Sequence, residues 1–286
     1  MEPTSELTTR DGLTLHVRDW PAPQGGGHGS VLIVHGLGEH IGRYEHVAAQ
    51  LNAAGWHVTG HDHRGHGRSQ GARGALARDD DYLADLALVI DRVRARARGP
   101  LVLLGHSLGG LVASRFVLGA PGASWARPVD ALVMSSPALD IGMSAPQKAL
   151  LALLGPIAPN LAVNNGLKPD WISRDPAVVR AYRDDPLVHD RVTPRVVRFL
   201  LDGGVAVRAA APAWAVPTLL MWAGSDRCVA PRGSAQFAAA APNGRVLARE
   251  FAPLFHEIFN EPEQAQVFAV LREWLEAYAR VSRSAA

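Results

Sequence analysis

The 286-residue chain contains very little cysteine and very little lysine. Its single cysteine, Cys228, has no partner for an intramolecular disulfide, so the fold must rest on packing alone. Lys148 and Lys168 are the only lysines among 29 basic residues, and arginine therefore carries nearly all the positive charge. The formal net charge is only +2, which argues against a nucleic-acid-binding protein and predicts no nucleic-acid partner.

Long apolar runs are also lacking. The longest, residues 149–163, is broken by glycine and proline and is too short to span a bilayer. Residues 1–20 contain acidic side chains such as Glu2, Glu6 and Asp11 and no apolar run, so we expect no secretory signal and a cytoplasmic protein. Hydrophobic residues nevertheless make up 48% of the chain, which is enough for a sizeable core in one α/β domain with an insertion.

Short runs rich in Val, Ile and Leu recur along the chain, each followed by a glycine-containing turn and a helical pattern. They cover residues 31–34, 101–104, 131–134 and 219–222. Such runs are typical of buried parallel strands, and their alternation with helices predicts an α/β fold with a doubly wound, mostly parallel sheet. Apolar and polar residues alternate over residues 13–18, which predicts a half-buried strand in an antiparallel edge hairpin.

The alternation of strands and helices stops after residue 136. Residues 137–216 are rich in proline and contain only short amphipathic pieces, and the strand pattern resumes at residue 218. We therefore predict a first part of the core at residues 1–136, a helical cap or lid at residues 137–216, and a second part of the core at residues 217–286.

A candidate nucleophile lies at the end of the apolar run 101–104. Residues 101–110 read LVLLGHSLGG, which is a buried strand followed directly by Gly-x-Ser-x-Gly and a helical pattern. A sharp strand-to-helix turn raises the serine hydroxyl above the sheet, and Gly105 and Gly109 let neighbouring backbone pass closely. The pattern indicates Ser107 as a catalytic nucleophile, although a glycine-rich structural turn is the alternative.

A catalytic serine needs a histidine base and a carboxylate that orients it. In proteins with this motif the partners follow in the order Ser, Asp or Glu, His. Asp226 follows the run 219–222, and His256 follows the strand-like run 246–251, so both lie at carboxyl ends of strands, where such sites assemble. Asp202 is a rival acid, but we expect it to end a helix before two glycines.

The negative charge that develops on a tetrahedral intermediate needs hydrogen-bond donors. One is expected to be the backbone N–H of Leu108, which follows the nucleophile. The other is assigned to the backbone N–H of Leu37, because the loop after residues 31–34 reads His-Gly-Leu-Gly and its glycines let the backbone turn inward.

Six motifs together resemble the monoacylglycerol lipases and lysophospholipases of the α/β-hydrolase superfamily. They are HGLGEH at 35–40, RY at 43–44, DHRGHGRS at 62–69, GHSLGG at 105–110, DPLVH at 185–189 and HEIFNEP at 256–262. The resemblance implies the triad Ser107, Asp226 and His256, with Leu37 and Leu108 forming the oxyanion hole. It also implies a lipid ester substrate, no cofactor and no metal, and a cap whose residues 149–163 form an apolar tunnel to the serine.

The resemblance leaves the substrate and the binding residues open. Head-group contacts in such lipases lie partly in the cap, where Asn164 and Asn165 are candidate substrate-binding residues. We predict a serine hydrolase that cleaves carboxylic esters of medium-to-long acyl chains, with monoacylglycerol as the first substrate. Lysophospholipase and general carboxylesterase activity are the alternatives. The sequence does not determine the oligomeric state or whether the cap touches a membrane surface.

Two other mechanistic classes are less favoured. Proline iminopeptidases hold the substrate amine with acidic cap residues, usually glutamate, and this chain has no glutamate between residues 46 and 249. A metallohydrolase is suggested by four histidines at 57, 61, 63 and 66, but Gly65 occupies the acid position of the metal-binding pattern His-x-His-x-Asp-His. These histidines are predicted to form a structural turn. His106 and Cys228, next to candidate catalytic residues, are predicted to pack.

Overall fold

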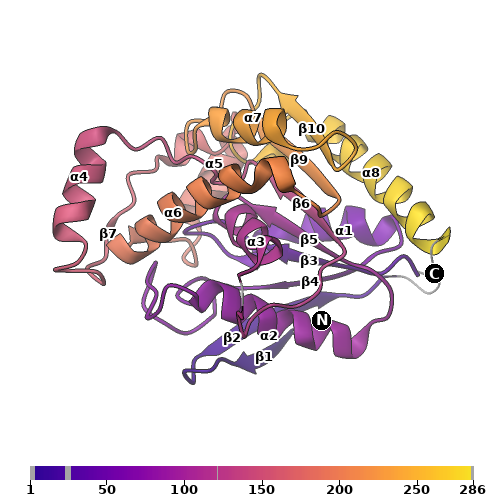
Figure 1. The fold of residues 1–286 in the computed structure, drawn as a ribbon, viewed down its shortest axis with the longest axis horizontal. Helices are drawn as coiled ribbons and strands as arrows, with labels where there is room; N and C mark the ends of the chain where they lie inside the picture. The colour runs from indigo at the N-terminus through magenta and orange to yellow at the C-terminus, as the bar shows by residue number, and fades with distance from the viewer. Residues whose placement is uncertain (1–3, 23–26, 121, 285–286) are drawn as a thin grey trace.

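The computed structural model describes residues 4–22, 27–120 and 122–284. Its described residues form an eight-stranded sheet in the order β1-β2-β4-β3-β5-β6-β9-β10 (Figure 1). β2 runs antiparallel to both of its neighbours, and the remaining pairs are parallel. The strands are β1 (Thr4–Thr8), β2 (Thr14–Trp20), β3 (Ser30–Val34), β4 (His57–His61), β5 (Leu101–His106), β6 (Ala131–Ser135), β9 (Thr218–Ala223) and β10 (Val246–Phe251).

The predicted strands and the mostly parallel sheet are confirmed. Every residue of β3, β5, β6 and β9 is buried, which explains why their sequences are continuously apolar rather than alternating. β2 shows the alternating burial expected of a half-buried strand, and it pairs with β1 as an antiparallel hairpin at the edge of the sheet.

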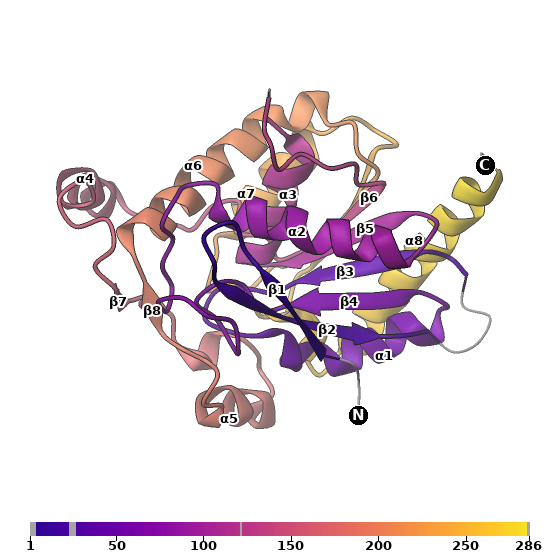
Figure 2. The same cartoon turned by 90° about the horizontal axis from the view of Figure 1, so that it is seen from below.

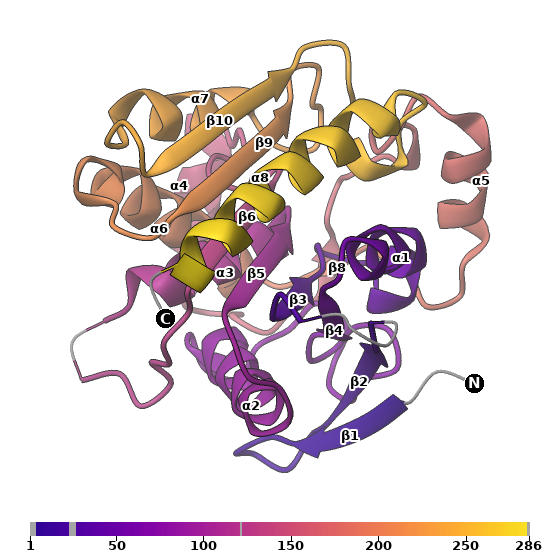
Figure 3. The ribbon, with the colours of Figure 1, turned by 90° about the vertical axis from the view of Figure 1, so that its right-hand side faces the viewer.

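Helices cover both faces of the sheet and enclose two hydrophobic cores. One core contains side chains of α2 (Asp81–Arg96), α3 (Leu108–Leu118), α6 (Pro194–Ala210) and α7 (Pro231–Ala240). The other contains side chains of α1 (Glu45–Ala53) and α8 (Gln264–Ser284). Figure 2 shows α2 crossing one face of the strands, and Figure 3 shows α8 alongside β9. The doubly wound α/β fold predicted from the sequence is therefore present.

Residues 137–216, which we call the β6–β9 segment, add no strand to the large sheet within the described part of the chain. They form α4 (Ala145–Leu154), α5 (Pro176–Asp184), α6, and a short ladder between β7 (Val163–Asn164) and β8 (Arg191–Val192). α4 projects from the body of the molecule in Figures 1 and 2, and α5 projects from it in Figures 2 and 3. The segment also contains short helices at Pro169–Trp171 and Ala211–Ala213, and another short helix at Ile258–Asn260 follows β10.

The prediction that Asp202 ends a helix is wrong, because α6 continues through Asp202, Gly203 and Gly204 to Ala210. The two glycines lie at close contacts within the helix rather than at a turn. A Cβ atom on Gly204 would lie 2.4 Å from the carbonyl oxygen of Leu139, and one on Gly203 would lie 3.2 Å from the Leu111 side chain. Asp202 is thus an exposed residue in the middle of a helix.

Candidate active site

Ser107 occupies the turn between β5 and α3, and its backbone conformation is unusual. Its φ of 54° and ψ of −118° are strained for a residue with a side chain. Hydrogen bonds hold the residue on both sides: its N–H donates to the Ser135 carbonyl at 3.0 Å, and its carbonyl accepts the N–H groups of Leu111 and Ala138. The sharp strand-to-helix turn predicted from Gly-x-Ser-x-Gly is therefore present, and these hydrogen bonds hold it in its strained conformation.

The two glycines of the motif allow the close approach on which this turn depends. A Cβ atom on Gly105 would lie 2.4 Å from the carbonyl oxygen of Gly109. A Cβ atom on Gly109 would lie 2.0 Å from the carbonyl oxygen of Val34, at the end of β3. Only glycine lets the start of α3 approach these backbone groups.

Asp226 and His256 follow β9 and β10, and the fold brings their side chains together. His256 Nδ1 lies 2.7 Å from Asp226 Oδ2, and the other carboxylate oxygen accepts the N–H groups of Cys228 and Val229. Burial opposes a charge on His256, but the attraction and hydrogen bond of Asp226 outweigh it and raise the pKa of the imidazole above its usual value. The pair has the geometry of an oriented general base.

Two backbone donors lie beside Ser107. Within the described ranges, neither the N–H of Leu37 nor that of Leu108 has a hydrogen-bond acceptor. The loop that contains Leu37 packs against the serine, since a Cβ atom on Gly36 would lie 3.2 Å from Ser107 Cβ. Two unpaired N–H groups at a candidate nucleophile are the donors that an oxyanion would need.

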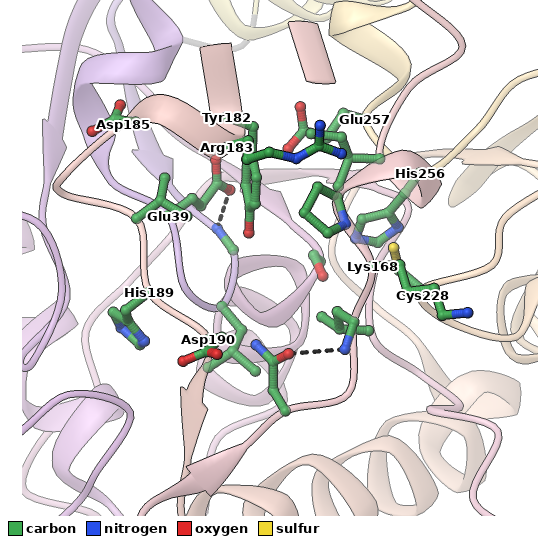
Figure 4. Close-up of a pocket in the computed structure, with 18 of the residues that line it drawn as sticks. Glu39, Lys168, Tyr182, Arg183, Asp185, His189, Asp190, Cys228, His256 and Glu257 are labelled. Atoms are coloured by element: carbon green, nitrogen blue, oxygen red, sulfur yellow. Dashed lines mark hydrogen bonds between the residues drawn. The ribbon is translucent and has the colours of Figure 1, made fainter. Parts of the chain in front are cut away.

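A pocket of about 510 Å³ opens over Ser107. Leu37, Ser107 and His256 line it from the core, and residues of the β6–β9 segment such as Lys168 line its other side (Figure 4). Asp226 lies behind His256, and Leu108 is buried beneath the serine, so neither side chain is part of the lining. The structure thus gathers all five residues of the predicted catalytic constellation around one pocket.

Asn164 and Asn165 also line this pocket, but much of their hydrogen bonding stabilises their own loop. The side-chain oxygen of Asn164 accepts the N–H of Gly166 at 2.8 Å, and its amide group donates to Asp190 at 2.6 Å. The side-chain oxygen of Asn165 accepts the N–H of Leu167 at 2.9 Å. Only the amide group of Asn165 has no acceptor among the described residues, which leaves it free for a ligand.

The expectation that residues 149–163 form an apolar tunnel to the serine is wrong in this structure. Among the described side chains of this stretch, none lines the pocket described above. Leu150, Leu153, Ile157 and Leu161 are instead between 57% and 77% exposed. The reason is that α4 projects from the body, so its apolar side chains face solvent rather than the serine (Figure 1).

The histidines that suggested a metal site are largely buried and neutral. His61, His63 and His66 are fully buried, which lowers their pKa values, to about 4 for His61. His63 Nε2 lies 3.0 Å from the carbonyl oxygen of His35, and His66 Nδ1 lies 2.9 Å from that of Arg64. The His63 and His66 rings contact backbone carbonyls, and the His61 and His66 rings each pack edge-on against that of His63, as expected of a structural turn.

The potential metal ligands of the described chain meet at a different place. One group of three has its ligand atoms within 4.8 Å of one another, and it consists of Asp226, Cys228 and His256. This group coincides with the acid and base described above. Burial raises the pKa of the Cys228 thiol far above its usual range, so the thiol is protonated.

His106 packs beside the base rather than acting as one. Its ring centroid lies 4.7 Å from that of His256, and Nδ1 lies 3.1 Å from Ser135 Oγ. Burial lowers the pKa of His106 to about 3, so its ring is neutral.

The sequence interpretation missed a buried charge cluster next to these residues. The Arg43 guanidinium binds the carboxylate of Glu39 at 2.7 Å and that of Glu257 at 2.6 and 2.7 Å. Glu39 belongs to the loop that contains Leu37, and Glu257 directly follows His256. The sequence did hold a sign of this cluster. All three residues lie in the motifs at 35–40, 43–44 and 256–262, although no role was assigned to any of the three side chains.

Comparisons with known proteins agree with this geometry. The family described as serine aminopeptidase S33 matches residues 26–263. A monoacylglycerol lipase from Mycolicibacterium smegmatis is 36% identical over 251 residues, which cover 86% of this chain and 88% of that protein. A phospholipase from Bacillus subtilis is 32% identical over 251 residues, covering 87% of this chain and 95% of that protein. The crystal structure of a Paleococcus ferrophilus monoacylglycerol lipase has a TM-score of 0.81 and 33% identity, covering 91% of this chain and 98% of that one.

Proposed function

Because the chain belongs to the monoacylglycerol lipase family of the α/β-hydrolases and is a carboxylic ester hydrolase, we propose that it cleaves monoesters of medium-to-long acyl chains, monoacylglycerol first and lysophospholipid second. One observation carries the proposal. Ser107 stands on a strained turn and shares a pocket with His256, whose Nδ1 lies 2.7 Å from Asp226. Nucleophile, base and orienting acid are thus all supplied by this chain.

In the proposed mechanism, Ser107 Oγ attacks the ester carbonyl while His256 accepts the hydroxyl proton. The N–H groups of Leu37 and Leu108 stabilise the oxyanion, each contributing about 3 to 4 kcal/mol to lowering the barrier. The intermediate collapses as His256 returns the proton to the leaving alcohol. A water molecule that His256 deprotonates then attacks the acyl-enzyme. The second tetrahedral intermediate collapses as His256 returns the proton to Ser107 Oγ, which releases the carboxylic acid and restores the serine. Asp226 orients His256 throughout and stabilises the imidazolium.

The acidic residues of the pocket do not favour an aminopeptidase. Glu39 and Glu257 both line the pocket, but both are engaged by Arg43. Asp185 accepts a hydrogen bond from His40 at 2.8 Å, and Asp190 is bound by Asn164. A free carboxylate for a substrate amine is therefore lacking among the described lining residues, so we expect esters to be preferred over amino-acid amides.

We also propose that residues 137–216 act as a cap and that its outer surface makes transient contact with lipid. Leu150, Leu153, Ile157 and Leu161 are exposed on or just after α4, and an exposed apolar patch of this kind favours a lipid surface over water. Within the described ranges, no helix combines the length and the apolarity needed to cross a bilayer. A cytoplasmic location stays part of the proposal, supported by a single, unpaired cysteine.

A rate panel tests the proposed reaction. Monoacylglycerols of increasing chain length, lysophospholipids, p-nitrophenyl esters and amino-acid amides would be compared for wild type, Ser107→Ala and His256→Ala. We expect turnover of long monoacyl esters by wild type, loss of turnover in both variants, and unchanged melting temperatures. A fluorophosphonate probe should label wild type and not Ser107→Ala. Faster cleavage of amides than of esters, or inactivation by EDTA but by neither substitution, would contradict the proposal.

The lipid contact has a separate test. Leu150→Ser combined with Leu153→Ser should weaken binding to lipid vesicles and slow hydrolysis of vesicle-borne monoacylglycerol, without changing the rate on a soluble short-chain ester. Val281→Ser is a matched control, because Val281 is 69% exposed on α8, away from the β6–β9 segment. Equal vesicle binding by the double variant and the control would remove the membrane contact from the proposal.

A further inference from the structure

We propose that Arg43 is a positioning residue of the hydrolase, whose guanidinium joins the oxyanion-hole loop to the loop that carries His256. The inference rests on the catalytic roles proposed above for Leu37 and His256. Arg43, Glu39 and Glu257 together keep the oxyanion donors and the general base in one fixed relation.

The contacts of Arg43 are directional on both sides. Nη1 donates to Glu39 Oε2 at 2.7 Å and to Glu257 Oε1 at 2.6 Å, while Nη2 donates to Glu257 Oε2 at 2.7 Å. The Arg43 side chain is 11% exposed, and those of Glu39 and Glu257 are 4% and 6% exposed. Since the pair with Glu257 is a two-point fork, it restrains orientation as well as distance.

On the Glu39 side, the restraint reaches the oxyanion-hole loop through a single carboxylate. Glu39 Oε1 accepts the backbone N–H of Gly36 at 2.6 Å and the hydroxyl of Tyr44 at 2.7 Å. Gly36 immediately precedes Leu37, so this hydrogen bond sets the peptide plane next to the candidate donor. Once Arg43 holds the other oxygen of Glu39, the loop cannot shift without breaking a buried charged hydrogen bond.

On the Glu257 side, the restraint reaches the base through one peptide bond. Glu257 directly follows His256, its N–H donates to the Ile172 carbonyl at 2.8 Å, and its carboxylate also accepts the Asn260 amide at 2.8 Å. The glutamate is thus held from three directions. A small displacement of a catalytic group costs a large factor in rate, so a rigid support of this kind has a direct effect on turnover.

Arg43 acts from outside the substrate pocket. Glu39 and Glu257 line the pocket, whereas Arg43 is not among its described lining residues. The guanidinium is covered on one side by the ring of Tyr182 in α5, with its central carbon 4.7 Å from the ring centroid. The β6–β9 segment therefore shields the cluster from water, which strengthens its electrostatic contacts.

The cluster also has an electrostatic effect on the base. The carboxylates of Glu39 and Glu257, with Arg43 as their shared counter-ion, lie near His256. Burial disfavours the imidazolium form of His256 and so lowers its pKa. The carboxylates that face the ring, those of Asp226, Glu257 and Glu39, all raise this pKa. The neighbouring His106 ring and Cys228 thiol are uncharged at neutral pH. The pKa of Glu257, which burial would raise, is lowered by Arg43 to about 2, so this carboxylate stays ionised.

The first test is Arg43→Lys, which keeps the charge but removes the planar fork. Arg92→Lys is the matched control, because Arg92 is a similarly buried arginine that binds Asp19 with both Nη atoms, away from the pocket. We expect kcat of Arg43→Lys on p-nitrophenyl butyrate to fall about tenfold or more, with KM within about twofold of wild type. Arg92→Lys should keep wild-type kcat. Melting curves of both variants give the fraction of folded protein at the assay temperature, and kcat is corrected for that fraction.

The second test separates positioning from a general loss of structure. Glu257→Gln removes one negative charge near His256, so the acid limb of the kcat/KM profile should move to lower pH by about half a unit. The inference is overturned if Arg43→Lys loses no more activity than Arg92→Lys, if its loss lies only in KM, or if the acid limb of Glu257→Gln stays in place. Absence of ester hydrolysis by wild type would overturn the proposed function itself, a result distinct from any of these.

Discussion

His61 offers a direct test of how the buried histidines affect stability. It ends β4, is fully buried, and neither ring nitrogen has a hydrogen-bond partner among the described residues. Burial lowers its pKa from 6.5 to about 4. His61→Leu would remove this titrating ring without breaking a hydrogen bond, at a similar side-chain volume.

The expected magnitude follows from the two protonation states. In the native protein His61 stays neutral down to about pH 4, whereas in the unfolded chain it titrates near pH 6.5. Between these values the unfolded state binds more protons, so stability falls as the pH drops through 6.5. From pH 7.5 to 5.5 this single residue costs about 1.3 kcal/mol of unfolding free energy. His35, His63, His66 and His106 also have lowered pKa values and act in the same direction.

Urea denaturation of wild type and His61→Leu at both pH values measures this difference. Any change in packing is present at both pH values and cancels in the comparison. We expect the variant to lose about 1.3 kcal/mol less than wild type between pH 7.5 and 5.5, and the two proteins to behave in parallel between pH 7.5 and 9. Equal losses on acidification would show that His61 is not held neutral, and would refute the argument.

Three further predictions concern the catalytic constellation. The pKa of His256 is raised and only its neutral form acts as a base, so kcat/KM should fall on the acid side with a midpoint above 6.5; a midpoint well below 6.5 would contradict this. Gly109→Ala should strongly lower the melting temperature or prevent folding, because the new Cβ would lie 2.0 Å from the Val34 oxygen; a melting curve like that of wild type would disprove the contact. Asp226→Asn should lower kcat by a factor of about 10³ to 10⁴ with little change in KM. Steady-state kinetics measures both constants, and a much smaller loss of kcat would contradict the role of Asp226.

Much of the fold could be predicted because its signals are local. β3, β5, β6 and β9 are buried on both faces, so each required an unbroken apolar run that is visible in the sequence. The strained turn at Ser107 likewise required glycines at 105 and 109, and the Gly-x-Ser-x-Gly pattern is visible as a short local motif.

The errors arose where a distant part of the chain decides the local conformation. Gly203 and Gly204 look like the end of a helix, but they lie inside α6 because they pack against Leu111 and the Leu139 carbonyl. Residues 149–163 look like the lining of a tunnel, but hydrophobicity alone does not say which side of a projecting helix faces the serine.

The sequence by itself determined the sheet, the order of Ser107, Asp226 and His256, and their places at strand ends, because parallel strands bring their carboxyl ends to one edge. Only the tertiary structure decided which groups surround them. The Arg43–Glu257 contact joins residues 214 positions apart. The N–H groups of Leu37 and Leu108, which have no acceptor among the described residues, come from the loop after β3 and from the start of α3. Such contacts depend on how distant loops pack over the sheet edge, and no local pattern of residues encodes that packing.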